Sequence, residues 1–484
     1  MLSPSLKKQA SFLFIGQLVS FLIISVSPII LVRLMSVEDY GLYQQALFVS
    51  AFVITLFNFR MPGSLYFFYS KSSMPLNTLL SQTIVMLFVF GFIGAALVYL
   101  AGYFSILPEG INKEVCLLIV LYICIESVAQ LIDHIFILEK TPVYSLLKGI
   151  VNSSVRLALV VGAAIFFGEV YFMVLGIVVL SLLRITVLIS FLAKRYNFSG
   201  KLFDRDLVRR QLKYIAPLAA ASVIGVCAAK FDKIIISYQM SAADFAIYTI
   251  GGLGLMSAVT MLYTSIGNVC LPKLSGFADK DDFNGAIVLW HKMMVINATI
   301  TIPAVVFCFV MAPIIMNILF GEAYEKSAEV WRINLFILIM QMLGYGYIPS
   351  AFGKTADILK ANVIRLIIAL PLLYILVDYL GLAGAAIAFV VSFWINGLIQ
   401  IMSGKRILKL SFGDLLPWGK FALISIVAIV FIPVIVFVND SSLTIYWKAI
   451  SAAIGYFSLV MVALLVFQVI SFNEVRSLLL GRKE

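Results

Sequence analysis

Apolar residues run along this chain in long uninterrupted blocks, and short polar connections separate the blocks. Each block is about 20 residues long, the length that an α-helix needs to cross a hydrocarbon core roughly 30 Å thick. The blocks lack the strict alternation of apolar and polar positions that a membrane β-barrel shows. The sequence predicts about fourteen helical segments, at residues 11–32, 44–60, 79–101, 115–138, 149–167, 170–192, 214–236, 246–270, 293–316, 330–350, 362–378, 383–402, 419–438 and 444–468. We therefore predict an all-α polytopic membrane protein.

The composition excludes a soluble domain. Of the 484 residues, 62% are hydrophobic and 12% are charged, whereas soluble proteins carry roughly 25% charged residues. The mean hydropathy is +1.07. The five cysteines and two histidines show no metal-ligand spacing, and no HExxH, P-loop or GxSxG motif occurs. We therefore expect no metal, no cofactor, no disulfide framework and no catalytic residue.

The first apolar block, 11–32, is expected to stay in the protein as a membrane helix. It is long for the core of a signal peptide, and no small-residue cleavage motif clearly ends it.

The formal net charge of +11 is explained by membrane topology, so we expect no nucleic-acid partner. Lys and Arg concentrate in alternate connections, and these residues favour the cytoplasmic side. The basic connections hold Lys7, Lys8, Arg60, Lys71, Lys140, Lys148, Lys194, Arg195, Lys201, Arg205, Arg209, Arg210, Lys213, Lys273, Lys280, Lys292, Lys354, Lys360, Lys405, Arg406, Lys409, Lys420, Arg476, Arg482 and Lys483. The opposite connections hold little more than Arg33, Lys113, Lys326, Arg332 and Lys448. Both termini are therefore predicted to be cytoplasmic.

A short motif occurs twice, 205 residues apart. Residues 35–43 read MSVEDYGLY and residues 240–248 read MSAADFAIY. Met, Ser, Asp, an aromatic residue, an aliphatic residue and Tyr recur in the same order. Both copies stand between two apolar segments, and a duplicated membrane unit explains this pattern.

The duplication predicts a division of the chain into two lobes. The basic connection at 193–213 is then a cytoplasmic linker between an N-terminal six-helix lobe, 1–192, and a C-terminal six-helix lobe, 214–404. Both copies begin on the same side of the membrane, so the two lobes are parallel repeats. Residues 405–484 add two helices and a cytoplasmic tail.

The second copy of the repeat carries charges that the first copy lacks. Lys230, Asp232 and Lys233 take the place of two serines and a proline. A charge at the centre of a membrane helix costs about 2.5–3.5 kcal/mol on insertion scales and usually faces water or a partner. The two lysines share a helix face and are candidates for substrate contact, with Asp232 as a counter-charge. The alternative is a structural group near the outer surface, where lysines extend to the interface.

Two carboxylates form a polar stripe in the segment at 115–138. Glu126, Gln130 and Asp133 lie at i, i+4 and i+7, on one face of a helix. A buried carboxylate can take up and release protons, so Glu126 and Asp133 are candidates for coupling to an H⁺ or Na⁺ gradient, or for counter-charges. The alternative is a structural ion pair between Glu126 and Arg156.

A basic ladder follows along the next segment. Lys148, Asn152 and Arg156 lie at intervals of four residues, which places Arg156 about 12 Å along the helix from Lys148. Arg can bind two phosphate oxygens at once, so this ladder suits a diphosphate.

Further cationic candidates are Arg184, Arg60, Arg365 and Arg332. The alternatives are cytoplasmic anchoring for Arg60 and Arg365 and extension to the outer surface for Arg332. Asn396 is expected to hydrogen-bond between helices. Because cations outnumber carboxylates inside the predicted helices, the sequence favours an anionic substrate.

Four stretches resemble a known family. Residues 32–43, VRLMSVEDYGLY, look like the segment after the first helix of polysaccharide-unit flippases, in the multidrug/oligosaccharidyl-lipid/polysaccharide exporter superfamily. Residues 232–248 look like the matching segment in the second half, where the family has Asp followed by a basic residue. LFGEAY at 319–324 and LGLAGAA at 380–386 resemble an external loop and a helix entry of the family.

This resemblance implies a flippase of the O-antigen or capsule type. Such a protein moves an undecaprenyl-diphosphate-linked glycan from the cytoplasmic to the periplasmic leaflet of the bacterial inner membrane, by alternating access driven by H⁺ or Na⁺. The implied partners are this lipid-linked glycan, membrane lipid, a polysaccharide polymerase and a chain-length regulator. The family motifs are mostly structural and assign no substrate residue here.

Four alternatives to this reading stay open. A drug/cation antiporter of the same superfamily is expected to have a carboxylate-rich cavity. A peptidoglycan-precursor flippase would differ in its cargo. A membrane-embedded polysaccharide polymerase or ligase is expected to carry a large external loop with catalytic residues. A non-transporting scaffold would leave the buried charges unexplained.

Overall fold

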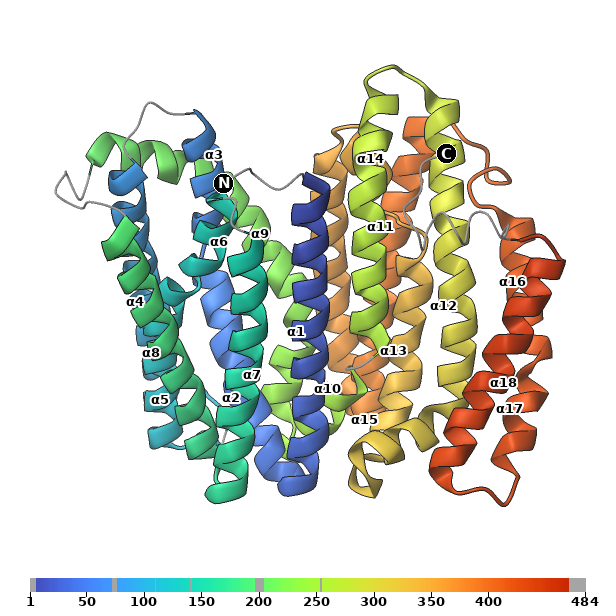
Figure 1. Ribbon diagram of the computed structural model, residues 1–484, viewed down its shortest axis with the longest axis horizontal. Coiled ribbons are helices and arrows are strands. Elements are labelled where there is room, and N and C mark those ends of the chain that lie inside the picture. The colour runs from blue at the N-terminus through green and yellow to red at the C-terminus, as the bar shows by residue number, and fades with distance from the viewer. Residues whose placement is uncertain are drawn as a thin grey trace. The chain divides into compact units, whose positions relative to one another are not determined.

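The computed structural model describes residues 6–71, 76–108, 110–139, 142–195, 204–252 and 255–469. The regular structure in these ranges is helical, and no strand occurs within them (Figure 1). The chain divides into two compact units, unit 1 at Met1–Ile247 and unit 2 at Tyr248–Glu484. Five of the basic residues used to predict topology lie outside the described residues, namely Lys140, Lys201, Arg476, Arg482 and Lys483.

Unit 1 is a bundle of helices in which neighbouring helices pack along much of their length. Its helices are α1 (Leu6–Leu34), α2 (Val37–Phe57), α3 (Met61–Lys71), α4 (Leu76–Tyr103), α5 (Lys113–Ala129), α6 (Leu131–Leu138), α7 (Pro142–Phe166), α8 (Val170–Arg195), α9 (Arg205–Gln239) and the first part of α10 (Ala242–Gly251). The helix α1 packs along α7, and α5 packs between α4 and α8 (Figure 1).

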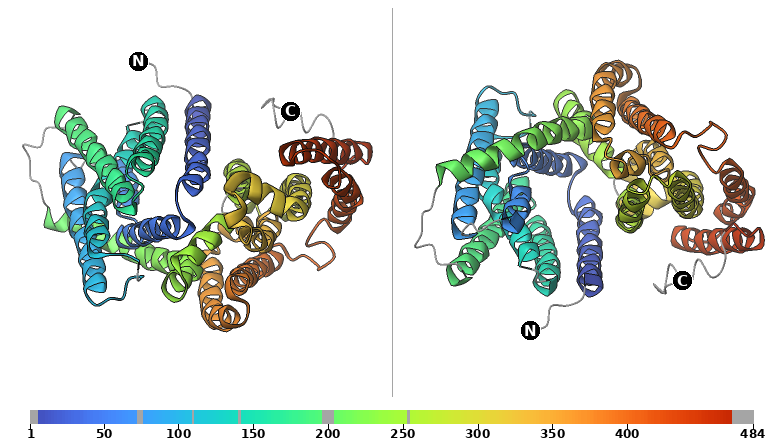
Figure 2. Two further views of the ribbon diagram at one scale, coloured as in Figure 1. Left: turned by 90° about the horizontal axis from the view of Figure 1, so that it is seen from below. Right: turned by 90° about the horizontal axis from the view of Figure 1, so that it is seen from above.

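Unit 2 is a second bundle with a long helix, α12, among its members. Its elements are the end of α10, α11 (Leu255–Ala278), α12 (Phe283–Phe320), the 3₁₀-helix η1 (Glu322–Tyr324), α13 (Ser327–Gln341), α14 (Tyr347–Ala351), α15 (Thr355–Leu408), α16 (Trp418–Val430), α17 (Ile432–Asn439) and α18 (Ile445–Val466). The helices α16 and α18 pack on α12, and α17 packs on α18 (Figure 2).

Each predicted apolar segment coincides with one or two of these helices. In the described ranges, ten helices are long and apolar enough to cross a membrane. One of them, α15, is 54 residues long and covers two predicted segments on either side of Gly381, whose φ of 55° and ψ of −132° interrupt the helix. Large apolar side chains such as Phe92 and Phe437 stay exposed on helix surfaces, as expected for lipid-facing positions. The all-α fold class is confirmed, and the protein is a multi-pass membrane protein.

The structure differs from the sequence prediction at several breaks. The predicted segment 115–138 is divided into two helices, since α5 ends at Ala129 and α6 begins at Leu131. The Gln130 side chain between them donates a hydrogen bond to the Ser127 carbonyl at 3.1 Å. The helix α3 was not predicted. In its described part, the predicted linker 193–213 consists of the end of α8 and the first turns of α9, and residues 196–203 lie outside the described range.

The two copies of the repeated motif begin helices in the same way. Ser36 is the N-cap of α2, and its Oγ accepts a hydrogen bond from the Asp39 backbone N–H at 3.0 Å while donating to the Asp39 carboxylate at 2.6 Å. Ser241 precedes α10 and makes the same two bonds with Asp244, at 3.1 and 2.7 Å. These bonds satisfy backbone donors that a helix start leaves without partners. The sequence repeat is therefore a repeat of local structure.

One difference between the copies has a steric reason. Gly41 of the first copy lies against the backbone of Ala242, and a Cβ at position 41 would come within 1.8 Å of the Ala242 carbonyl oxygen. The second copy has Ala246 at the equivalent position, where it is fully buried. Only glycine fits the close backbone approach at position 41.

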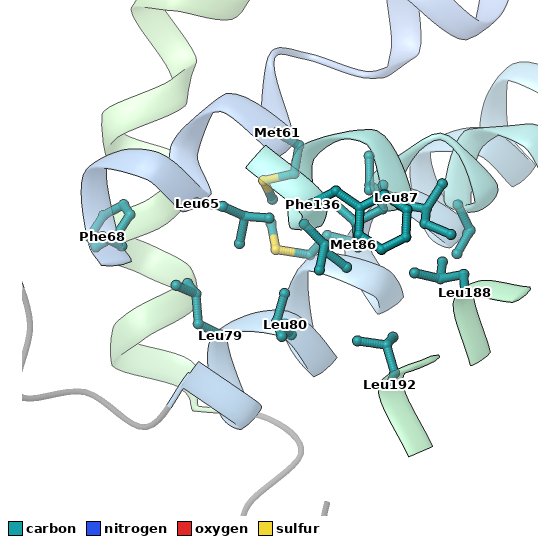
Figure 3. Close-up of a cluster of buried hydrophobic side chains, with 14 of the residues drawn as sticks. Met61, Leu65, Phe68, Leu79, Leu80, Met86, Leu87, Phe136, Leu188 and Leu192 are labelled. Atoms are coloured by element: carbon teal, nitrogen blue, oxygen red, sulfur yellow. The ribbon is translucent and has the colours of Figure 1, made fainter. Parts of the chain in front are cut away.

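The core of unit 1 includes the helix that the sequence did not predict. Met61 and Leu65 of α3 are fully buried in a cluster that also contains Leu80 of α4 and Leu188 and Leu192 of α8 (Figure 3). The apolar face of α3 is short, so it does not reach the length of a predicted membrane segment. The packing nevertheless makes α3 a structural part of the bundle.

A buried polar network joins α9 to α3 and α4. The Gln211 side chain is fully buried, and its amide nitrogen donates to the Ser64 Oγ at 2.7 Å and to the Thr83 Oγ1 at 3.1 Å. Its carbonyl oxygen accepts from the Gln82 amide at 2.9 Å. Buried side-chain amides require such partners. The start of α9 is therefore held in unit 1 by hydrogen bonds as well as by apolar contact.

The close approach at Gly41 predicts a position-specific loss of stability. Gly41→Ala places a methyl group against backbone that has to shift, and we expect destabilisation by about 1–3 kcal/mol. Gly162→Ala in α7 is the control, because no atom lies within 4 Å of a Cβ there, and in a helix this change stabilises by about 0.5–1 kcal/mol. Thermal unfolding of the purified chain in detergent, followed by fluorescence, measures both. Equal melting temperatures for the two variants would contradict the steric reason.

Candidate functional site

Four ionisable side chains from four helices form a connected group in unit 1, which we call the ion chain. Arg184 of α8 pairs with Glu126 of α5 and, at 3.0 Å, with Asp133 of α6. Lys148 of α7 pairs with the same Asp133. Ser181, one turn before Arg184, donates a hydrogen bond to Glu126 at 2.7 Å. The ion chain therefore ties α5, α6, α7 and α8 together.

The burial of the ion chain falls from one end to the other. The Glu126 residue is 7% exposed, whereas the Asp133 side chain is 49% exposed. Removing a carboxylate from water is costly, and a paired cation offsets that cost only with good hydrogen-bond geometry. Glu126 has such geometry, because Arg184 and Ser181 bind its two different oxygens. The two predicted coupling carboxylates are thus joined through one arginine.

The ion-pair partner of Glu126 is Arg184, whereas the sequence suggested Arg156. Within 4 Å, the carboxylate of Glu126 pairs with Arg184, and Arg156 acts on it electrostatically from further away. The guanidinium of Arg156 instead interacts with the phenol of Tyr43, and Tyr122 is close enough to act on it. Two phenols and the Glu126 carboxylate therefore act on Arg156 inside an apolar helix bundle.

A pocket of about 440 Å³ lies between α6, α7 and α8 of unit 1. Its walls are largely aliphatic and aromatic, and its polar lining comes from Lys148, Asn152 and Arg184. Arg156 does not line this pocket, so the predicted ladder of Lys148, Asn152 and Arg156 is divided. Its first two members face the pocket, and the third faces Tyr43.

The charged group of α9 remains a candidate. Lys230 is exposed, Lys233 is partly buried, and Asp232 between them is 4% exposed. Both Lys230 and Asp232 act electrostatically on Lys233. The three predicted residues thus form one local group within α9.

Two further predicted cations, Arg60 and Arg332, lie at a turn and at a contact between two helices. Arg60 is exposed in the turn between α2 and α3, with a φ of 58°. Arg332 of α13 donates from its Nε to the Phe309 carbonyl at 2.9 Å and lies 5.5 Å from the centre of the Phe309 ring. This contact joins α13 to α12.

Unit 2 contains a polar cavity of about 470 Å³, which we call the unit 2 cavity. It is lined by Thr260, Tyr263, Thr264, Leu271, Gln341, Gly344, Tyr345, Gly346, Tyr347, Ser350, Ile358, Asn362, Arg365, Asn396 and Gln400. The predicted residue Arg365 is part of this lining. Its guanidinium lies 5.0 and 5.2 Å from the ring centres of Phe389 and Phe393, a cation–π arrangement that holds it at the cavity wall.

Sequence reasoning missed most of the unit 2 cavity. Asn396 was assigned to contact between helices, and neither Gln400 nor Asn362 was proposed as a site residue. The available signal was spacing, because Asn362 and Arg365 lie at i and i+3, and Asn396 and Gln400 at i and i+4, so each pair shares a helix face. The fold brings these two faces of α15 together across Gly381.

Comparison with protein families matches residues 6–277 to the family described as polysaccharide biosynthesis protein, which is more than half of the 484 residues. The chain belongs to the polysaccharide biosynthesis protein family. The resemblance to polysaccharide exporters seen in the sequence is confirmed.

Two relatives and one solved structure extend this comparison. A putative O-antigen transporter of Shigella flexneri is 23% identical over 230 residues, 47% of this chain, and the chain spans 54% of that relative's length. The capsular polysaccharide biosynthesis protein CapF of Staphylococcus aureus is 23% identical over 416 residues, covering 83% of this chain and 99% of CapF. The lipid II flippase MurJ, in its inward closed conformation, has a TM-score of 0.69 at 17% identity and covers 94% of this chain and 98% of its own. This structural likeness shows the fold.

The ion chain predicts strong coupling between Arg184 and Glu126. Arg184→Gln leaves a buried carboxylate with Ser181 as its remaining hydrogen-bond donor, and we expect a loss of about 3–5 kcal/mol. Adding Glu126→Gln removes the uncompensated charge, so the double variant should recover most of that loss. Thermal unfolding of the single and double variants measures the coupling.

The matched control is Arg195→Gln, which removes an arginine side chain that is 64% exposed from its pair with Glu139 at 3.4 Å. We expect it to change stability by less than about 1 kcal/mol. Losses that simply add in the double variant would mean that Arg184 and Glu126 are not coupled.

Proposed function

We propose that this protein is a flippase for undecaprenyl-diphosphate-linked oligosaccharide repeat units of the O-antigen or capsule type. It moves them from the cytoplasmic to the periplasmic leaflet of the bacterial inner membrane by alternating access, and it performs no chemical reaction on them. Membership of the polysaccharide biosynthesis protein family supports this proposal. The names of the O-antigen transporter and of the capsule protein support the cargo class.

The observation that carries the proposal is the position of Arg156. It lies in the middle of the apolar helix α7, where the Tyr43 and Tyr122 phenols and the Glu126 carboxylate act on its guanidinium. A diphosphate cannot cross a hydrocarbon core without a compensating charge. Among the described residues, Arg156 forms no ion pair within 4 Å, and a guanidinium can bind two phosphate oxygens at once. Arg156 is therefore proposed as a diphosphate contact, together with Lys230 and Lys233 of α9.

The ion chain is proposed as the coupling element. Asp133 is half exposed and pairs with both Lys148 and Arg184, so H⁺ or Na⁺ arriving at Asp133 would compete with these two cations. Loss of one pair would change the contacts among α6, α7 and α8. A polysaccharide polymerase and a chain-length regulator are proposed as protein partners downstream of this step.

The transport role of Arg156 is tested in proteoliposomes loaded with a fluorescent lipid-linked oligosaccharide. We expect Arg156→Ala to lower the initial flipping rate at least about tenfold, because a hydrogen bond to a charged group contributes about 1.5–3 kcal/mol. Arg156→Lys should restore part of the rate, and Lys230→Ala should also reduce it.

Arg195→Ala is the control for this assay, since that side chain is exposed on the last turn of α8. Normal flipping by both Arg156→Ala and Lys230→Ala would remove these residues from the site. In cells, deletion of the gene should leave lipid-linked repeat units on the cytoplasmic leaflet. Unchanged surface polysaccharide with new drug sensitivity would instead indicate a drug antiporter.

The distribution of Lys and Arg predicts the topology of the C-terminus. A fluorescent protein fused after residue 484 should fold and fluoresce in the cytoplasm. The same fusion with alkaline phosphatase should be inactive, because that enzyme needs the periplasm to form its disulfides. An active phosphatase fusion would place the C-terminus outside.

A further inference from the structure

Three side-chain amides form a directed chain along one wall of the unit 2 cavity. Gln400 donates from its Nε2 to the Asn396 Oδ1 at 2.7 Å, and Asn396 donates from its Nδ2 to the Asn362 Oδ1 at 2.9 Å. Both polar atoms of Asn396 are used in this way. The chain leaves an acceptor at one end, the Gln400 Oε1, and a donor at the other, the Asn362 Nδ2. Both end residues line the cavity.

The remaining wall adds further neutral hydrogen-bonding groups. Gln341 accepts a hydrogen bond from the Thr260 hydroxyl at 3.0 Å, which leaves the amide nitrogen of Gln341 as a second donor. Tyr345 contributes a phenol and an aromatic surface, and its ring packs edge-on against Phe393 at 5.9 Å between ring centres. The cavity thus combines separated donors and acceptors with an aromatic wall.

This arrangement selects among ligand classes. Polar groups that line a cavity in an apolar unit need hydrogen-bond partners. An apolar cation would call for carboxylates, and the described residues that line this cavity include none. A diphosphate would call for several cations, and Arg365 is the single cation in the same lining. A hydroxyl group both donates and accepts hydrogen bonds, so a ligand with several hydroxyl groups matches the two ends of the amide chain.

We propose that the unit 2 cavity is a sugar-binding subsite, in which Gln400 and Asn362 hydrogen-bond hydroxyl groups of the cargo's glycan. The volume of about 470 Å³ lies within the roughly 300–1,000 Å³ of small-molecule sites. Tyr345 packs against the sugar ring, and Arg365 forms part of the wall beside it. This inference rests on the proposed function and extends it, since it names residues of unit 2 that would bind the glycan part of the proposed cargo.

Equilibrium binding of free sugars tests the subsite. The full chain is placed in lipid nanodiscs, which avoids sugar-headed detergents, and titrated calorimetrically with glucose, galactose, mannose, N-acetylglucosamine and glucuronate. Inorganic pyrophosphate is titrated separately. We expect at least one sugar to bind, and we expect Gln400→Leu and Asn362→Ala each to weaken that binding about three- to tenfold, as the loss of one hydrogen bond does.

Asn439→Ala is the matched control, because Asn439 ends α17 in an exposed position outside the cavity lining. It should leave sugar affinity within about twofold, since it removes no cavity group. Melting temperatures of all variants show whether they are folded. If Gln400→Leu does not fold, the binding measured with Asn362→Ala tests the subsite.

The proposal is overturned if no sugar of the panel binds, if pyrophosphate alone binds, or if both cavity variants keep full affinity. A wild-type chain that flips lipid-linked oligosaccharide but binds no sugar would overturn this subsite and leave the proposed function standing. A chain that binds sugar through Gln400 but flips no lipid-linked oligosaccharide would support the subsite and overturn the proposed function.

Discussion

The stability of the unit 1 bundle depends on partners for its buried charged side chains. Glu126 is nearly buried in a bundle of apolar helices, and a lone carboxylate there would be far more stable in the unfolded chain. Arg184 and Ser181 bind its two oxygens, and Arg184 also reaches Asp133. This single arginine therefore decides how α5, α6 and α8 fit together. Removing this arginine would leave a buried carboxylate uncompensated, which is strongly destabilising.

The two units handle polar groups in different ways. Unit 1 concentrates charged side chains, with Arg156 set among phenols and Lys148 and Arg184 paired with carboxylates. Unit 2 lines its cavity mainly with amides, hydroxyls and aromatic rings. The polar groups of unit 1 therefore suit charged ligands, whereas those of the unit 2 cavity suit ligands that both donate and accept hydrogen bonds.

Much of the helical pattern could be predicted from the sequence, because lipid requires long apolar segments and leaves a strong signal. The repeated Ser–x–x–Asp motif likewise has a local cause, a helix N-cap, so its sequence predicts its structure. The helix α3 could not be predicted, since eleven residues are too few for a spanning helix and its partners lie elsewhere in the chain. The partner of Glu126 and the amides around Asn396 depend on contacts distant in sequence, which periodicity does not encode.

The contact of Gly41 with Ala242 has a consequence for the history of the chain. Two identical halves would carry the same residue at both equivalent positions, yet the first copy has glycine and the second has alanine. Since a methyl group does not fit at position 41, the second copy's sequence could not replace the first copy's without loss of fit. The two copies of the motif are therefore not exchangeable at this position. Two copies of the second motif could not make this contact.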